Sequence, residues 1–109
     1  MRLWFEPITI EMLNHRGLNT MTDFLGIEFI EIGDDYLKAR MPVTAKIKQP
    51  LGIVHGGANV VLAETLASVA ANCVVDQARQ YCVGLEINAN HIRAVSENNV
   101  LGVTRMLHI

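Results

Sequence analysis

The chain has few cysteines and no strong excess of charge of either sign. Its 109 residues include two cysteines, Cys73 and Cys82, and carry a formal net charge of −2. Neither cysteine stands in a Cys-x-x-Cys spacing, so we expect no disulfide framework, and a reducing cytoplasm is the simpler location. Because no long basic run is present, nucleic acid is not an expected partner.

Long apolar runs are also missing. The N-terminal stretch carries Glu6, Pro7 and Glu11 where a signal peptide would need an apolar core. Residues 58–75 are strongly apolar, but polar side chains interrupt them at Asn59, Glu64, Thr65, Ser68 and Asn72. No uninterrupted run reaches the roughly 18 residues that a membrane span requires. We therefore expect a buried helix here and no membrane association.

The chain does contain enough hydrophobic residues to build a core. Half of its residues are hydrophobic and 18% are charged, a composition that excludes intrinsic disorder. A chain of this length supports one domain, which we place over residues 1–109. A core of that size gives marginal stability, so association with another copy is expected.

The first half of the chain shows one short helical pattern and two strand patterns. A helix is expected over residues 9–18, with Gly17 as its stop. Residues 26–33 and 36–43 alternate apolar and polar side chains and should pair as a hairpin. The first of these stretches breaks strict alternation at residues 29–30, which allows for a bulge.

A long buried helix is expected next, over about residues 57–78, because this stretch is apolar on nearly all sides. A strand over residues 80–95, a turn at residues 96–99 and a last strand from Val100 follow. This order predicts an α+β fold in which antiparallel strands surround one central helix.

The long helix carries one narrow polar stripe. Glu64, Ser68 and Asn72 follow the i, i+4 spacing that places side chains on one face, with small Ala67 and Ala71 beside them. An ionised carboxylate in a core is costly unless it is paired or hydrated, so the stripe indicates a crevice. The plain alternative is a solvent-facing glutamate or a structural ion pair, which is the more common role of a lone helical acid.

The sequence His55-Gly56-Gly57 stands where this helix begins. Backbone N–H groups lack partners there, the helix dipole is positive, and glycine allows a ligand close to the backbone. These features are typical of an oxyanion hole. Glu64 lies about 11–12 Å further along the helix, at 1.5 Å per residue. Both groups can therefore act on one carbonyl only if a neighbouring subunit supplies Glu64, which favours a dimer.

The histidines do not indicate a metal site. His55 and His91 lack the spacing to acids or cysteines that metal ligation needs, and each is more often structural than catalytic. Cys73 is expected to be a small core residue. We therefore expect neither a metal nor a cofactor.

Two stretches together resemble the hotdog-fold thioesterases of the PaaI-like superfamily. They are "QPLGIVHGGANVVLAETLASVA" and "VGLEINANHIRAV", and the resemblance extends over nearly the whole chain from about Leu3. It implies an antiparallel sheet wrapped around the central helix, a homodimer or tetramer, and hydrolysis of an acyl-CoA or acyl-carrier-protein thioester with an aromatic acyl group. Domains of this family normally continue through two further strands, so we expect a shorter sheet here.

The resemblance also implies roles for individual residues. Glu64 matches the catalytic carboxylate, acting as nucleophile on the thioester carbon or as general base for water, and the Gly56 N–H matches the oxyanion donor. Gln49 and His55 match catalytic residues near the thioester carbonyl. The residues that match the substrate-binding set are Gly57, Ser68 and His91. On position alone, Lys46, Lys48 and Arg93 are candidates to bind CoA phosphates.

Two alternatives remain open at the level of the sequence. The domain could bind acyl groups or serve only in assembly, without catalysis. It could also be a hotdog hydratase or dehydratase, which uses a helix-borne acid with a histidine at the β-carbon. Retention of the His-Gly-Gly motif with an acid two turns along the helix favours the hydrolase.

Overall fold

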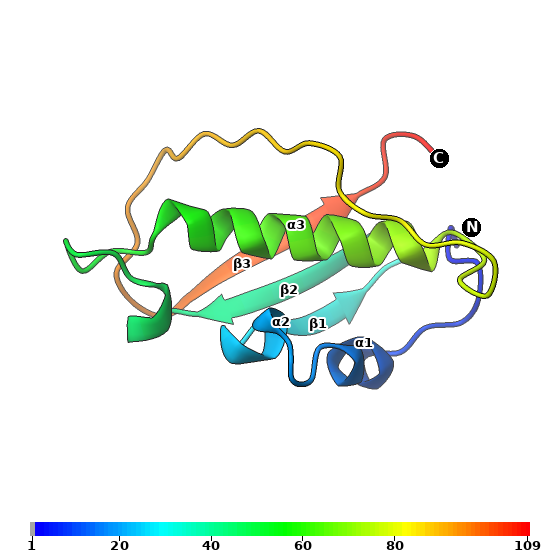
Figure 1. The fold of residues 1–109 in the computed structure, drawn as a ribbon, viewed down its shortest axis with the longest axis horizontal. Coiled ribbons are helices and arrows are strands. Elements are labelled where there is room, and N and C mark those ends of the chain that lie inside the picture. Colours follow the sequence, from blue (N-terminus) through cyan, green and yellow to red (C-terminus); the bar gives the residue numbers. More distant parts are fainter. Residues whose placement is uncertain (1) are drawn as a thin grey trace.

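The computed structural model describes residues 2–109 and shows a long helix lying across one face of an antiparallel sheet (Figure 1). The elements are α1 (Ile10–Arg16), α2 (Met21–Phe24), β1 (Glu28–Ile32), β2 (Tyr36–Pro42), a 3-10 turn (Ala45–Ile47), α3 (Gly56–Cys73) and β3 (Asn99–Arg105). The strands lie in the order β1-β2-β3, and both pairings are antiparallel. The predicted α+β class is confirmed.

The predicted hairpin is confirmed as β1 and β2. Phe29 pairs with Ala39 and Ile32 with Leu37, and the register shifts between Phe29 and Glu31. This shift is a β-bulge, because two residues of β1 there oppose one residue of β2. The broken alternation in the sequence had allowed for such a bulge. The turn closes where the Gly33 N–H donates to the Tyr36 carbonyl at 2.9 Å.

The core lies between α3 and the sheet. Alternate residues of β2 are fully buried, and they face one side of α3. The helix residues buried on that side are Ala58, Leu62, Leu66, Ala70 and Cys73. Gly102 lets β3 approach the helix, since a Cβ there would lie 2.5 Å from Leu66 Cδ1 and 3.3 Å from Leu62 Cγ. Within residues 2–109, no helix has both the length and the hydropathy of a membrane span.

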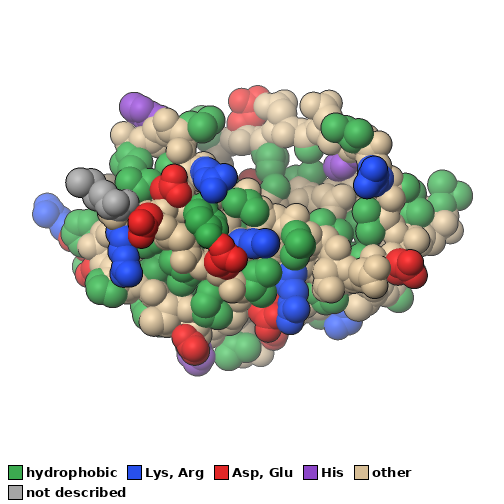
Figure 2. Space-filling model, turned by 180° about the vertical axis from the view of Figure 1, so that it is seen from behind, with side chains coloured by type: hydrophobic (Ala, Val, Ile, Leu, Met, Phe, Trp, Pro, Cys, Tyr) green, Lys and Arg blue, Asp and Glu red, His purple; other side chains and the backbone are tan. Residues whose placement is uncertain are grey.

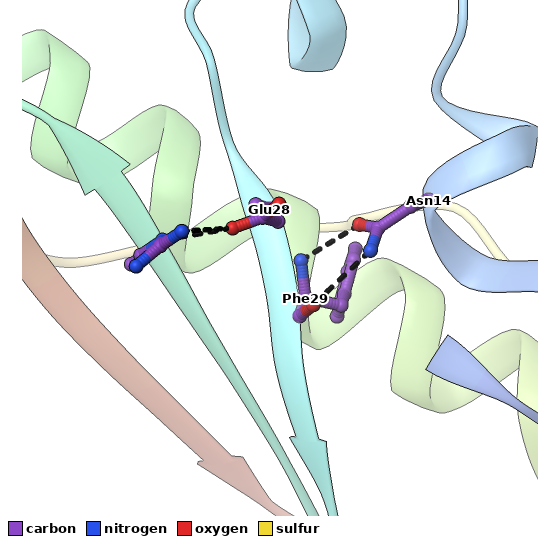
Figure 3. A network of polar contacts seen from close by, with 4 residues as sticks. Asn14, Glu28 and Phe29 are labelled. Atoms are coloured by element: carbon purple, nitrogen blue, oxygen red, sulfur yellow. Dashed lines mark hydrogen bonds and ion pairs between the residues drawn. The ribbon is translucent and has the colours of Figure 1, made fainter. Parts of the chain in front are cut away.

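A side chain from α1 occupies the outer edge of β1 (Figure 3). The Phe29 N–H donates to Asn14 Oδ1 at 2.8 Å, and Asn14 Nδ2 donates to the Phe29 carbonyl at 3.1 Å. The Asn14 amide thus bonds to Phe29 as the backbone of a neighbouring strand would. On the other side of β1, Arg40 Nε donates to Glu28 Oε1 at 2.8 Å.

The helix α3 ends five residues before its predicted end at Ala78. Val74 closes the helix, and its N–H donates to the Ala71 carbonyl. Asp76 then starts a turn, since its Oδ1 accepts the Ala78 N–H at 3.1 Å and its carbonyl accepts the Arg79 N–H at 3.0 Å. A short polar side chain that bonds nearby backbone competes with the helix, and the apolar pattern does not reveal this.

The strand predicted over residues 80–95 is wrong. Among the residues that the structure describes, this stretch pairs with no strand; it runs as an extended trace past α3 (Figure 1). Its alternating side chains are typical of a strand, but a ladder needs a neighbouring backbone, and here α3 lies beside it. The turn after it is confirmed at Asn98, with φ of 70°, and the last strand is confirmed as β3.

We predict that Asn14→Ala lowers the free energy of unfolding by about 1–3 kcal/mol, because it leaves the partly buried N–H and C=O of Phe29 without partners. Urea denaturation measures the change. Asn90→Ala, at an exposed position, is the matched control and should shift stability by no more than about 0.5 kcal/mol. Equal losses in the two variants would contradict the role given to Asn14.

Candidate active site

The polar stripe expected on the long helix is present on α3. Ser68 Oγ donates to Glu64 Oε2 at 2.9 Å, and Asn72 Nδ2 donates to the Ser68 carbonyl at 2.8 Å. All three side chains belong to half-buried residues. At 100° per residue they lie on the side of α3 turned away from the sheet-facing residues. The stripe is therefore covered by something other than the sheet.

Residues 80–96 form that cover, and they run antiparallel to α3. The Cys82 N–H donates to Asn72 Oδ1 at 2.7 Å, and Asn72 Nδ2 donates to the Cys82 carbonyl at 3.0 Å. Further along, Gly84 lies against the Glu64 carboxylate. The molecule is hollowed beneath this covering segment (Figure 2).

The same segment reaches the start of α3 at its other end. An added Cβ on Gly56 would lie 2.9 Å from His91 Nε2, so the imidazole is packed against this glycine. The segment is fixed again at Val95, whose carbonyl accepts the Val54 N–H at 2.8 Å. The covering segment thus joins the two ends of the candidate site.

The two glycines at the start of α3 have different partners. His55 is the N-cap of the helix, and its Nδ1 accepts the Gly57 N–H at 2.8 Å. Within residues 2–109 the Gly56 N–H donates to no protein acceptor. Only the Gly56 N–H therefore remains available to a ligand oxygen, while His55 holds the helix start in shape.

An open cavity of about 310 Å³ lies beside this helix start. It brings together three of the residues singled out in the sequence, Gln49, Gly56 and His91, with the phosphate candidate Arg93. Its other lining residues are Ile53, Val54, Asn59, Ile92, Ala94 and Val95. The cavity is therefore lined by both apolar and polar residues, a combination typical of small-molecule sites.

Other candidate residues lie outside this cavity. At 1.5 Å per residue, Glu64 lies about 12 Å along α3 from Gly56, and Ser68 lies about 18 Å from it. Lys46 Nζ donates to the Phe24 carbonyl at 3.3 Å and lies 4.4 Å from the centre of the Phe24 ring. The polar groups thus form two clusters in one chain: the helix start with its cavity, and the Glu64–Ser68 pair.

Two further side chains have contacts within the chain that bear on their chemistry. Cys73 is 2% exposed, as expected of a core residue, and burial raises the pKa of its thiol, which the nearby Arg16 offsets only in part. Gln49 Oε1 accepts the Leu51 N–H, which fixes the loop before α3. The part of the chain that the structure describes holds no cluster of three His, Cys, Asp or Glu side chains.

Comparison with known proteins identifies the family. Residues 51–109, which include the whole of α3 and β3, match the model of the thioesterase superfamily. The chain belongs to the thioesterase superfamily. Relatives at 45–50% identity are named hydrolases or thioesterases, so the protein is a thioester hydrolase, and the resemblance drawn from the sequence is confirmed.

Individual relatives agree with this assignment. The 1,4-dihydroxy-2-naphthoyl-CoA hydrolase of Escherichia coli is 50% identical over 107 residues, covering 98% of this chain and 78% of that protein. The proofreading thioesterase EntH of Cronobacter turicensis is 45% identical over 98% of this chain and 77% of its own length. A crystal structure of a mutant of thioesterase PA1618 from Pseudomonas aeruginosa superposes with a TM-score of 0.96 at 45% identity, covering 98% of this chain and 77% of that one. The hotdog fold of these thioesterases is therefore the fold of this chain.

Sequence reasoning missed two residues of the candidate site. Gly84 contacts the Glu64 carboxylate, and Asn59 lines the cavity and has an Oδ1 atom that is buried without a hydrogen-bond partner in residues 2–109. A glycine inside a strand-like pattern is a known signal of close approach by another group, so Gly84 could have been found. No sequence signal distinguishes Asn59 from other polar interruptions of the helix.

We predict that Asn72→Ala loosens the covering segment and raises the alkylation rate of Cys82 about thirtyfold, since it removes two hydrogen bonds worth about 1 kcal/mol each. Mass spectrometry after iodoacetamide labelling measures the rate. Cys73, which is buried, is the internal control and should stay slow. Equal acceleration of both cysteines would indicate general unfolding and contradict local anchoring by Asn72.

Proposed function

We propose that the chain is an acyl-CoA or acyl-carrier-protein thioesterase in which Glu64 attacks the thioester carbon or activates the water that does so. The observation that carries this proposal is the hydrogen bonding of the Glu64 carboxylate. Its Oε2 accepts the Ser68 hydroxyl at 2.9 Å, while Oε1 accepts from no donor in residues 2–109. A fixed carboxylate with one free oxygen can serve as nucleophile or general base, and general-base help is worth about 10²–10⁴ in rate.

The Gly56 N–H supplies the second part of the proposed mechanism. Attack on a thioester places negative charge on the carbonyl oxygen, and the unpaired N–H at the start of α3 would stabilise that charge together with the helix dipole. Removal of one such donor costs about 10²–10³ in kcat. Gln49 and His91, which line the adjacent cavity, would orient the acyl group or the water.

The distance between these two groups favours a site shared by two subunits. Gly56 and Glu64 lie about 12 Å apart along one helix, too far to act on the same carbonyl. The covering segment also exposes apolar side chains, with Val83 at 76%, Leu85 at 100% and Ile92 at 95% exposure. A second copy packed on this segment would bury them and bring its own Glu64 toward Gly56.

The names of relatives guide the choice of substrate. One relative at 50% identity is a hydrolase of 1,4-dihydroxy-2-naphthoyl-CoA, which has an aromatic acyl group. The cavity of about 310 Å³ beside Gly56 is comparable with small ligand sites, and its apolar lining residues suit an aromatic ring. Arg93 at the same cavity is placed to bind a phosphate of CoA or of the carrier's prosthetic arm.

We predict that the protein releases thiol from aromatic acyl-CoA thioesters and that Glu64→Gln lowers kcat/KM by about 10²-fold or more. The substitution keeps the size of the side chain and the bond from Ser68 but removes the negative charge. A thiol-reactive dye follows the release from a panel of aromatic and aliphatic acyl-CoAs.

Glu11→Gln, an exposed acid on α1, is the matched control and should leave the rate unchanged. If the folded parent binds these thioesters without turnover, the acyl-binding alternative replaces this proposal. If it adds water to an enoyl-CoA instead of releasing thiol, the hydratase alternative does.

We predict that two inactive variants, Gly56→Pro and Glu64→Gln, restore activity when they are co-expressed. Proline is tolerated at the first helical position, where it removes the N–H, and the φ of −66° and ψ of 128° at His55 suit a residue before proline. A mixed dimer would contain one intact site, so a statistical mixture should regain about a quarter of the parent rate.

Gly56→Ala is the control for the proline variant. Both substitutions place a Cβ against His91, but only proline removes the N–H donor. The alanine variant should therefore be the more active of the two by about 10²-fold. No recovery of activity in purified mixed oligomers would contradict the shared site.

A further inference from the structure

Gly84 lies directly against the group to which we assign the chemistry. A Cβ added at this position would lie 2.8 Å from both Cδ and Oε1 of Glu64, and closer still to Oε2. Real Cβ atoms do not approach other heavy atoms so closely. Any side chain at residue 84 would therefore force the Glu64 carboxylate to move.

The backbone itself gives no reason for a glycine here. The glycines with positive φ among residues 2–109 are Gly26 and Gly52, so Gly84 does not need the left-handed conformation. Gly84 is also exposed, which means that an alanine would not overfill the core. The three atoms that an added methyl group would approach most closely all belong to the carboxylate of Glu64.

The carboxylate is bonded to Ser68 and lies close to the backbone of residue 84. Ser68 Oγ donates to Oε2 at 2.9 Å, and Oε2 is also the atom that an added Cβ on residue 84 would approach most closely. The backbone at residue 84 is held in turn, because the peptide groups of Cys82 are bonded to Asn72. A movement of the carboxylate away from residue 84 would strain or break its bond to Ser68.

We propose that Gly84 is a positioning residue for Glu64. Its missing side chain leaves the space in which the carboxylate is held against Ser68. This inference rests on the proposed function of Glu64 and adds to it a determinant outside α3. Since the colliding group is the far end of a flexible side chain, Gly84→Ala should disturb the position of the carboxylate much more than the stability of the fold.

The test begins with Gly84→Ala. A displacement of about 1 Å in a reacting group can cost about 10²-fold in rate, so we expect kcat to fall by about 10–100-fold with KM changed less than about twofold. The urea midpoint should stay close to that of the parent. Gly17→Ala, at a φ of −81° at the end of α1, is the matched glycine control and should leave kcat unchanged.

A shorter acid should relieve the collision. Glu64→Asp withdraws the carboxylate by one methylene, which removes the atoms that an alanine at residue 84 would strike. In the Asp background, Gly84→Ala should therefore cost less than about twofold, so the two substitutions should be strongly non-additive. Additive losses in this cycle would overturn the proposal.

A readout that does not depend on turnover separates this proposal from the function on which it rests. In protein labelled with carbon-13 at the glutamate carboxyl groups, the Glu64 resonance is assigned by its absence in Glu64→Gln. It should shift in Gly84→Ala and stay in place in Gly17→Ala. An unchanged resonance would overturn the positioning role, whereas a shifted resonance in a parent that hydrolyses no thioester would uphold it and refute the proposed reaction.

Discussion

The packing of α3 against β2 and β3 is the constraint on which the rest of the structure depends. Five small or branched residues on one side of the helix are buried against the sheet. With that side fixed, the rotation of the helix about its axis is fixed as well, and Glu64, Ser68 and Asn72 must face away from the sheet. The candidate chemistry thus lies on the side of the helix that the core leaves uncovered.

The covering segment packs on the polar stripe of α3 and completes the candidate site. Asn72 bonds to both peptide groups of Cys82, and Val95 bonds to Val54 just before α3. Between these two anchors the backbone passes close to Glu64 and brings His91 to Gly56. The segment thus contributes to the candidate site by the position of its backbone, and the hydrogen bonds at its two ends fix that position.

The elements that depend on local pattern could be predicted from the sequence. The hairpin with its bulge, the first helix, the start of α3 and the last strand follow from periodicity and glycine positions. The fate of residues 80–95 could not be predicted, because a strand pattern describes side chains and says nothing about which backbone lies alongside. The i, i+4 spacing indicated the pair of Glu64 and Ser68. A glycine in a strand pattern can signal close approach, but that Glu64 is the group approaching Gly84 required coordinates. The roles of these residues in catalysis stay predictions.

The amide of Asn14 makes the two edges of the sheet different. Because it already occupies the hydrogen-bonding groups of Phe29 at the outer edge of β1, another strand cannot be added there without first displacing it. The opposite edge, at β3, has no such block within residues 2–109. A sheet that can be extended on one side only cannot stack head to tail into an open fibre. Pairing of two copies through their backbones would therefore join two β3 edges and close on itself.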